Sequence, residues 1–329
     1  MGKILKVLEK KGEIKGAQNA FKKTMDKFSD KTGEILIGGL GWHERREVSW
    51  SGELGIWWVT YCLPNRYENA FGVTEPRWES GYGHSVSCVI DVPFSKINRR
   101  IGGAFAEDEK NLFLMHRGRI GGGRKGVGKT LFIDNYTGKF VPVRDGNVWS
   151  EMALVAAIKS ERCPIQVAYF VKELQRIKQQ RKSSGGNSGA QSRELLATDT
   201  LIEESSGTRT YFVGDVVAEC DHGIVVSSLS EFLRNKGFQT AYKRPVDLYT
   251  VDGQKISALF EVKTDVTSTD CYMATGQLLF YSSEIKEKPT LLAVFPKNLC
   301  EKYKNAFETV GIKLITYDWI NDKPRFTGL

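Results

Sequence analysis

RPVDLYTVDGQKISALFEVKT, residues 244–264, has the pattern of two β-strands joined by a tight turn. Apolar side chains alternate with others over residues 246–251, and residues 256–262 form a second apolar run. The dipeptide Asp252-Gly253 between them is a favoured two-residue turn. We therefore expect a β-hairpin whose strands border a packed core.

Three charged side chains interrupt this apolar hairpin, namely Asp247, Glu261 and Lys263. Because side chains alternate along a strand, Glu261 and Lys263 share one face, and cross-strand pairing can bring Asp247 beside them. Charges grouped at the edge of a core are costly to desolvate unless something binds there. The grouping favours a divalent cation site, and the alternative is an ordinary hairpin with surface charges.

The Glu-x-Lys spacing alone carries little information, because it occurs at three other places in the chain. Those three lie in polar segments. Only residues 261–263 stand in an apolar strand that follows an Asp-bearing strand and a turn. The context of the motif is therefore more informative than the motif.

The flanking segments predict helices and further strands. Upstream, residues 224–237 form an amphipathic helical pattern, with Asp221 as N-cap and Gly237 as the stop. Downstream, residues 270–283 predict a helix in which Gln277 and Tyr281 share a face. A strand (290–295), a helix (299–310) and a strand (313–319) follow. The expected order is helix, strand, strand, helix, strand, helix, strand.

Pro245-Val246-Asp247 followed by Glu261-Val262-Lys263 resembles the PD-(D/E)XK nuclease superfamily, with one additional residue between Pro and Asp. The helix carrying Gln277-x-x-x-Tyr281 resembles the RecB-like branch of that superfamily. The resemblance covers about the last third of the chain. It implies a restriction-endonuclease-like α/β core, a mixed sheet flanked by helices.

The resemblance also implies roles for individual residues. Asp247 and Glu261 would hold Mg²⁺, for which Mn²⁺ can substitute, with the carbonyl of Val262 as a further ligand. Lys263 would orient the attacking water and offset charge in the transition state, while Gln277 and Tyr281 would line the active site. Oxygen ligands suit Mg²⁺, and a bound cation makes hydroxide available near neutral pH. The alternatives for a third acidic ligand are Glu231 and Glu219.

Composition limits the class of protein. A length of 329 residues suggests two domains, and a hydrophobic content of 41% suffices for packed cores. We expect no membrane association, because no apolar run approaches a bilayer span and the Lys-rich start lacks a signal core. The six cysteines are widely spaced without a Cys-x-x-Cys pair, which favours a reducing, cytoplasmic location over a zinc site or disulfide scaffold.

The chain divides by pattern near residue 190. Residues 1–31 predict a Lys-rich, solvated helix, and short strand patterns with Gly, Pro and Asn turns fill residues 34–143, including TLFID at 130–134. A helix at 164–182 follows. Ser and Gly dominate residues 183–192. We therefore assign residues 1–182 to a basic, aromatic-rich, β-rich α+β domain, 183–208 to a flexible linker and 209–329 to the nuclease-like domain.

The net charge of +8 is concentrated in the first part of the chain. Residues 1–200 carry 32 Lys and Arg against 22 Asp and Glu, whereas residues 201–329 carry 15 against 17. Basic surface attracts nucleic-acid phosphates. Within a glycine-rich stretch, residues 116–130, we expect phosphate contacts from Arg117, Arg119, Arg124, Lys125 and Lys129. His222 precedes the helix beside the expected site, where it would touch nucleic acid or cap the helix.

The glycine-rich stretch allows two other interpretations. Gly123–Thr130 spells the phosphate-binding pattern GxxxxGKT, but that pattern requires a following helix, and residues 130–134 read as a strand. The other interpretation of this stretch is an exposed basic hairpin without a partner. Separately, nine aromatic residues between positions 42 and 82 either fill a β core or stack on an unpaired base.

These patterns predict a two-domain, Mg²⁺-dependent DNA endonuclease of the prokaryotic restriction or defence type, with an N-terminal domain that reads DNA and senses modified bases. Because many nucleases cut both strands as dimers, a homodimer is a further expectation, although no dimer face is visible in the sequence. The alternatives are a nucleic-acid sensor with an inactive or partner-dependent nuclease fold, and a P-loop NTPase.

Overall fold

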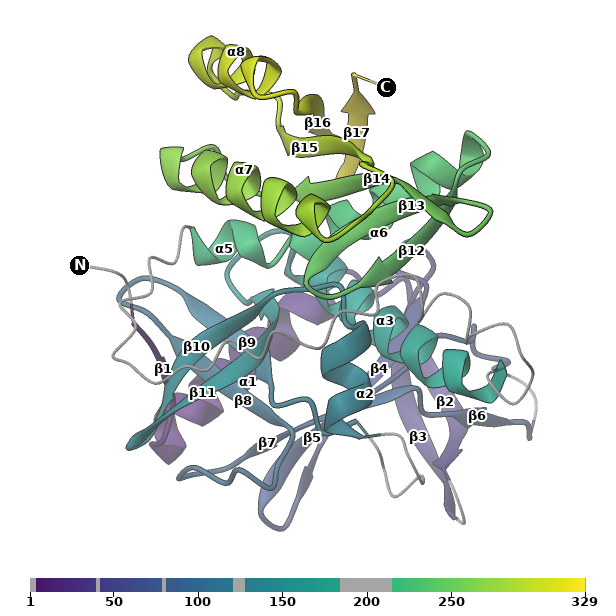
Figure 1. Cartoon of the computed structure of the whole chain (residues 1–329). Coiled ribbons are helices and arrows are strands. Elements are labelled where there is room, and N and C mark those ends of the chain that lie inside the picture. Colours follow the sequence, from purple (N-terminus) through teal and green to yellow (C-terminus); the bar gives the residue numbers. More distant parts are fainter. Residues whose placement is uncertain (1–3, 40–41, 79–80, 121–127, 184–214, 329) are drawn as a thin grey trace. The chain divides into compact units, whose positions relative to one another are not determined.

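The computed structural model describes residues 4–39, 42–78, 81–120, 128–183 and 215–328. The chain divides into two compact units, residues 1–179 and 180–329. Within the described residues there are seven helices and three sheets, each of which combines parallel and antiparallel strand pairs (Figure 1). The expectation of a mixed α/β protein is thus confirmed. Of the predicted linker, residues 184–208 lie outside the described part.

The N-terminal unit contains two β structures. Five strands close a barrel in the order β1-β10-β11-β9-β8, and six form a sheet in the order β6-β2-β3-β4-β5-β7. The barrel strands are β1 (Leu5–Val7), β8 (Gly103–Glu107), β9 (Leu112–His116), β10 (Phe140–Asp145) and β11 (Val148–Ala157). The sheet strands are β2 (Lys31–Gly39), β3 (Trp42–Ser51), β4 (Ile56–Leu63), β5 (Arg66–Gly72), β6 (Gly83–Ser85) and β7 (Cys88–Pro93).

Helices α1 (Lys11–Asp26) and α3 (Cys163–Ser183) contribute to one core with both β structures. The Lys-rich segment predicted as a solvated helix therefore has an apolar face, on which Ile14, Phe21 and Met25 are buried. Spacing of three to four residues puts these side chains on one side of the helix and leaves the lysines outside. The predicted helix at 164–182 corresponds to α3.

The strand predicted for residues 130–134 is wrong, because the chain there forms helix α2 (Lys129–Asn135). Phe132 is fully buried, and its ring stacks on Tyr136 with centroids 4.7 Å apart. The pattern of a short apolar run is compatible with a strand or with a helix. Here the helix is the conformation in which Phe132 packs into the core.

The C-terminal unit is built on a six-stranded mixed sheet in the order β12-β13-β14-β15-β16-β17. Its strands are β12 (Gln239–Lys243), β13 (Val246–Asp252), β14 (Lys255–Val262), β15 (Thr290–Pro296), β16 (Lys313–Ile320) and β17 (Lys323–Thr327). The central pairs β14–β15 and β15–β16 are parallel, and the outer pairs are antiparallel. The two edge strands, β12 and β17, were not predicted.

Helices cover both faces of this sheet (Figure 1). Helix α7 (Ser268–Ser283) and helix α8 (Glu301–Thr309) pack on one face, through Leu278 and Phe307. Helix α6 (His222–Asn235) packs on the other face, through Val225 and Leu229, and is preceded by the short α5 (Val216–Glu219). The C-terminal unit therefore has three layers, with the sheet between two layers of helices. In the described part of the chain, no helix combines the length and apolarity needed to cross a membrane.

Candidate functional site

The predicted hairpin is formed by β13 and β14. Leu248 pairs with Phe260, and continuing this register by one residue sets Asp247 across from Glu261. Asp252 pairs with Lys255, so the turn consists of Gly253 and Gln254, one residue later than predicted. Gly253 adopts a positive φ of 59°, which a residue without Cβ accepts readily. The carboxylates thus lie at the end of the hairpin opposite the turn.

Lys263 is buried beside Glu261, with only 5% of its surface exposed. Its Nζ donates to Glu261 Oε1 at 2.7 Å and to Gln277 Oε1 at 2.8 Å. Burial alone would favour the neutral amine, but the charges of Glu261, Asp247 and Glu219 outweigh it and raise the pKa of Lys263 above its ordinary value. Lys263 is therefore a cation fixed among carboxylates.

Asp247 is held by the backbone and by a histidine. Its Oδ2 accepts from the N–H of Val262 at 2.9 Å and lies 3.1 Å from His222 Nε2. A carboxylate accepts, so the ring donates through Nε2. His222 was expected to touch nucleic acid or cap its helix. It is instead 1% exposed and fixes the orientation of Asp247.

Helix α7 brings Gln277 and Tyr281 to the same site. Thr267 and Asp270 form a reciprocal capping box at its start, which sets the position where the helix begins. Burial raises the pKa of Tyr281, a hydrogen bond with Gln277 opposes this, and the nearby Glu261 and Asp247 add to it. All five residues predicted to be catalytic therefore lie in one electrostatically connected group.

The structure distinguishes the two alternatives for a third acidic residue. Glu219, at the end of α5, is among the charges that raise the pKa of Lys263. Glu231 is exposed on α6 and is not among the main charges that shift the pKa of Lys263 or Tyr281. Of the two, Glu219 is therefore the acidic side chain whose charge acts on the site.

The donor set suits a hard cation that keeps part of its water shell. Among the described residues, no three or more His, Cys, Asp and Glu side chains gather closely enough to hold a metal. Asp247, Glu261 and the carbonyl of Val262 would supply oxygen ligands only. Mg²⁺ is commonly bound through one or two carboxylates with several waters, so these residues fit it.

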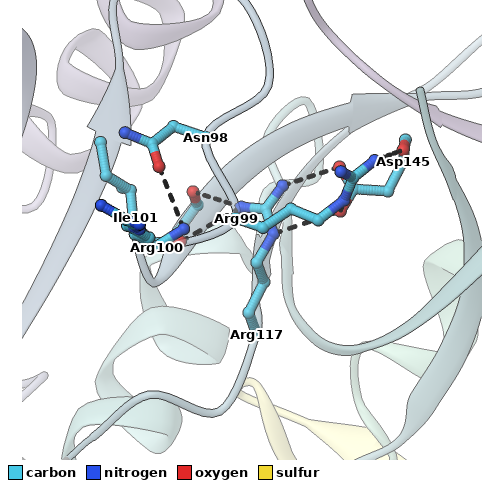
Figure 2. Close-up of polar contacts among 7 residues, drawn as sticks. Asn98, Arg99, Arg100, Ile101, Arg117 and Asp145 are labelled. Atoms are coloured by element: carbon cyan, nitrogen blue, oxygen red, sulfur yellow. Dashed lines mark hydrogen bonds and ion pairs between the residues drawn. The ribbon is translucent and has the colours of Figure 1, made fainter. Parts of the chain in front are cut away.

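The residues predicted to contact phosphate differ in their exposure. Arg117 is 7% exposed, and Figure 2 shows its guanidinium turned to Asp145. Its Nη2 donates to Asp145 Oδ1 at 2.9 Å, and its Nη1 donates to the carbonyl of Gly103 at 3.0 Å. Arg99 contacts the same carboxylate at 3.3 Å. The assignment of Arg117 to phosphate binding is therefore corrected, because the barrel encloses its charge.

Arg119 and Lys129 are exposed, as phosphate contacts require, whereas Arg124 and Lys125 lie outside the described residues. Helix α2 begins at Lys129, so the helix that the GxxxxGKT spelling requires is present, contrary to the expectation. Residues 121–127 of that stretch lie outside the described part. Nucleotide binding therefore stays an alternative, as it was from the sequence.

The aromatic stretch of the N-terminal unit is largely part of its core. Trp57, Trp58 and Phe71 are buried, whereas Tyr82 is 65% exposed. This favours the core interpretation over a base-stacking role for those three rings.

Comparison of the chain with protein-family models, curated proteins and solved structures finds no match. The function proposed below therefore rests on the residues of the site.

Proposed function

We propose that the C-terminal unit is a Mg²⁺-dependent nuclease of the PD-(D/E)XK type that hydrolyses phosphodiester bonds in DNA. The observation that carries this proposal is the buried Lys263 ammonium, bonded to Glu261 and Gln277 and influenced by Asp247. A buried cation that joins a strand to a helix is costly as a structural device, because a pair of apolar side chains would pack there as well. Such arrangements are found preferentially at functional sites.

Each residue has a part in the proposed reaction. Asp247, Glu261 and the Val262 carbonyl would hold the cation, which when bound lowers the pKa of water and offsets charge on the phosphate. Lys263 stabilises negative charge at the attacked phosphate, and Gln277 keeps its ammonium in place. His222 holds the carboxylate of Asp247 in one orientation. Tyr281, one helical turn after Gln277 on α7, belongs to the same electrostatic group as Glu261, Asp247 and Lys263.

The N-terminal unit would supply affinity for DNA. The excess of Lys and Arg over Asp and Glu lies in residues 1–200, and Arg119 and Lys129 are exposed there. Phosphate contacts position a nucleic acid without reading its sequence. A restriction or defence role, with modified bases as the signal, is the biological setting that we propose for this pairing of a basic unit with a nuclease unit.

The test is cleavage by the purified full chain with Mg²⁺, on unmodified, modified and single-stranded DNA and on RNA. We expect DNA cleavage that EDTA abolishes and Mn²⁺ supports. Glu261→Gln and Lys263→Met should each reduce the rate by about a hundredfold to a thousandfold, the scale on which single electrostatic catalytic groups act. Lys255→Ala is the matched control, because Lys255 lies in the same strand but is exposed at the turn.

Two results would remove the proposal. One is cleavage by Lys263→Met at the wild-type rate. The other is an equal loss of activity in Lys255→Ala, which would show that the assay reports folding or a contaminant rather than the site.

A second candidate is a nucleic-acid sensor whose nuclease fold is inactive or waits for a partner. It is favoured by the small number of acidic ligands, since the described residues contain no cluster of three. DNA binding with a steep salt dependence, combined with no cleavage of any substrate under Mg²⁺ or Mn²⁺, would support it over the enzyme.

A further inference from the structure

The β10–β11 hairpin of the N-terminal unit carries an exposed tryptophan. Trp149 is 53% exposed and its neighbour Val148 43%, whereas Trp57 and Trp58 of the same unit are buried. Arg144, the partner of Trp149 across the hairpin, lies over its ring at 5.8 Å from the ring centroid. A guanidinium is attracted to the face of an aromatic ring, most strongly to that of Trp. The hairpin therefore presents a large ring that is oriented from within the unit.

Trp149 belongs to a row of side chains that crosses three strands of the barrel. Arg144 of β10 pairs with Trp149 of β11 on one side and with Lys6 of β1 on the other. The residues before them, Leu5 and Val143, are buried. Because side chains alternate along a strand, Lys6 and Arg144 face outward. Two strand spacings set Lys6 about 10 Å from Trp149, roughly the length of three stacked nucleotides of one strand.

A basic loop, residues 96–100, lies against the tip of the same hairpin. Its sequence is Lys-Ile-Asn-Arg-Arg. Arg99 contacts Asp145 Oδ2 at 3.3 Å and donates from Nη2 to the Asp145 carbonyl at 2.6 Å. Asp145 is fully buried, and Figure 2 shows Arg99 and Arg117 both turned to it. This carboxylate therefore holds the loop beside the hairpin.

The loop and the row together form a surface with a positive charge. Within the described part of the chain, four of its cations form no ion pair, namely Lys6, Lys96, Arg100 and Arg144. Arg99 and Arg117 together add one charge beyond that of Asp145. Three carboxylates border the surface: Glu107 opposite Lys6, Glu9 near Gly146, and Glu151 two residues after Trp149. Five positive charges against three negative charges leave a net charge of +2.

An exposed ring among unpaired cations fits a single nucleic-acid strand. In such complexes the bases stack on aromatic side chains, and Lys and Arg follow the phosphates. A duplex covers the faces of its bases, so only an unpaired or extruded base can stack on a surface ring. A protein interface has an apolar centre that is depleted of charge. Here only Ile4 and Val148 are exposed apolar residues near the ring, and Lys6 and Arg144 stand between them.

We propose that the β10–β11 hairpin and the loop of residues 96–100 form a binding site for single-stranded DNA. One base stacks on Trp149, and the adjoining phosphates lie against Lys6, Arg100 and Arg144. The choice of DNA over RNA rests on the proposed nuclease function. The site itself belongs to the N-terminal unit and requires no metal.

The first experiment measures binding of a labelled oligothymidylate of about 12 nucleotides to the full chain by fluorescence anisotropy. EDTA is present, so no strand is cut. Trp149→Ala should raise the Kd roughly fivefold to 150-fold, the range measured for loss of one base–aromatic stack. The Kd for a duplex of the same length should not change, because its bases are covered. Thermal unfolding of the variant should match that of the wild type, since the ring is largely exposed.

Three further variants separate stacking from other effects. Trp149→Phe should keep most of the affinity for the single strand, because any aromatic face can stack on a base. Trp149→Leu keeps an apolar side chain without such a face, and it should bind as weakly as Trp149→Ala. Tyr82→Ala is the matched control, because Tyr82 is 65% exposed and has Arg77 over its ring at 4.9 Å, but lies before β6 of the other β structure. It should bind like the wild type.

The second experiment tests the phosphate contacts. Arg100→Gln and Lys6→Gln should each lower the slope of log Kd against log salt concentration by about 0.7, the contribution of one phosphate contact to a single strand. Trp149→Ala should leave this slope unchanged, because the ring carries no charge. A slope that is equal in the wild type and in both charge variants would remove these two residues from the site.

Five results would overturn the proposal. They are wild-type affinity in Trp149→Ala, equal binding by Trp149→Leu and Trp149→Phe, an equal loss in Tyr82→Ala, tighter binding of oligouridylate than of oligothymidylate, and loss in Trp149→Ala of binding to vesicles of phosphatidylcholine and phosphatidylserine without loss for the oligonucleotide. Absence of binding by the wild type would overturn it as well. If the strand binds through Trp149 and no DNA is cut with Mg²⁺, the nuclease proposal fails and this one stands. If DNA is cut and Trp149→Ala binds like the wild type, the reverse holds.

Discussion

Replacing Lys263 with methionine removes a buried ammonium while keeping an unbranched side chain of similar length. The carboxylate of Glu261, which is 1% exposed, then loses the partner that lies 2.7 Å away. Removing one member of a buried ion pair leaves an uncompensated charge. Truncation at Lys263 therefore affects stability as well as activity, and the two effects must be separated.

The loss of folding stability in Lys263→Met has an upper limit, because Glu261 can take up a proton and become neutral. An ordinary Glu has a pKa of about 4.3, so holding it neutral at pH 7 costs about 3.7 kcal/mol, which limits the loss of stability. In the variant the folded-state pKa of Glu261 is raised above its unfolded value. The loss is therefore fully developed above the raised pKa and shrinks by about 1.4 kcal/mol per pH unit as the pH falls toward 4.3.

The double variant Glu261→Gln/Lys263→Met separates stability from catalysis. Both buried charges are then absent, so we expect most of the lost stability to return, within about 1 kcal/mol of the wild type. Activity should stay absent, because neither the ligand nor the cation is restored. This pairing distinguishes a collapsed site from an intact but inactive one.

Amide hydrogen exchange provides the assay, because peptides from β14 and α7 report on the C-terminal unit and peptides from β9 and β11 serve as an internal reference. A loss of about 3.7 kcal/mol corresponds to roughly five-hundredfold faster exchange of the most protected amides at pH 7. Wild-type protection in Lys263→Met, or equal losses in the single and double variants, would refute the reasoning.

Three further predictions concern the N-terminal unit. Burial lowers the pKa of His116 to about 3, so the unfolded chain binds one more proton than the folded chain below pH 6.5. On acidification, the free energy of unfolding of the wild type, measured by chemical denaturation, should therefore fall by about 1.4 kcal/mol more per pH unit than that of His116→Gln. Equal slopes for the two proteins would contradict this. Arg117→Met should destabilise the unit in thermal unfolding by at most about 3–5 kcal/mol, because Asp145 is fully buried but keeps its contact with Arg99. The salt dependence of DNA binding should stay unchanged. Gly72→Ala should cost about 1–3 kcal/mol in thermal unfolding, since a Cβ would lie 2.3 Å from the fully buried ring of Trp57.

Sequence pattern was most informative where local spacing and long-range packing agree. The alternation of β14 placed Glu261 and Lys263 on one face, and the four-residue spacing placed Gln277 and Tyr281 together. The meeting of strand and helix could be expected only from the family resemblance, because no local rule states that Lys263 reaches Gln277. The hydrogen bond between them now gives that expectation a physical basis.

Sequence pattern failed where a partner distant in the chain decides. Arg117 belongs to a run of basic residues that suggests a phosphate contact, yet Asp145, 28 positions later, draws it into the barrel. His222 likewise has its partner 25 positions away in Asp247. A charged residue can have the same sequence neighbours whether it is buried or exposed, so only the tertiary structure distinguishes the two cases.

The geometry of the hairpin offers a place to attach a reporter. Residues 252–255 are exposed at the turn, and five residues of β13 separate the turn from Asp247, a distance of about 17 Å along the strand. Exposed turns of this kind commonly accept insertions. A short peptide tag or a coupled dye placed there would follow the protein during purification and imaging without touching the side chains on which the chemistry depends.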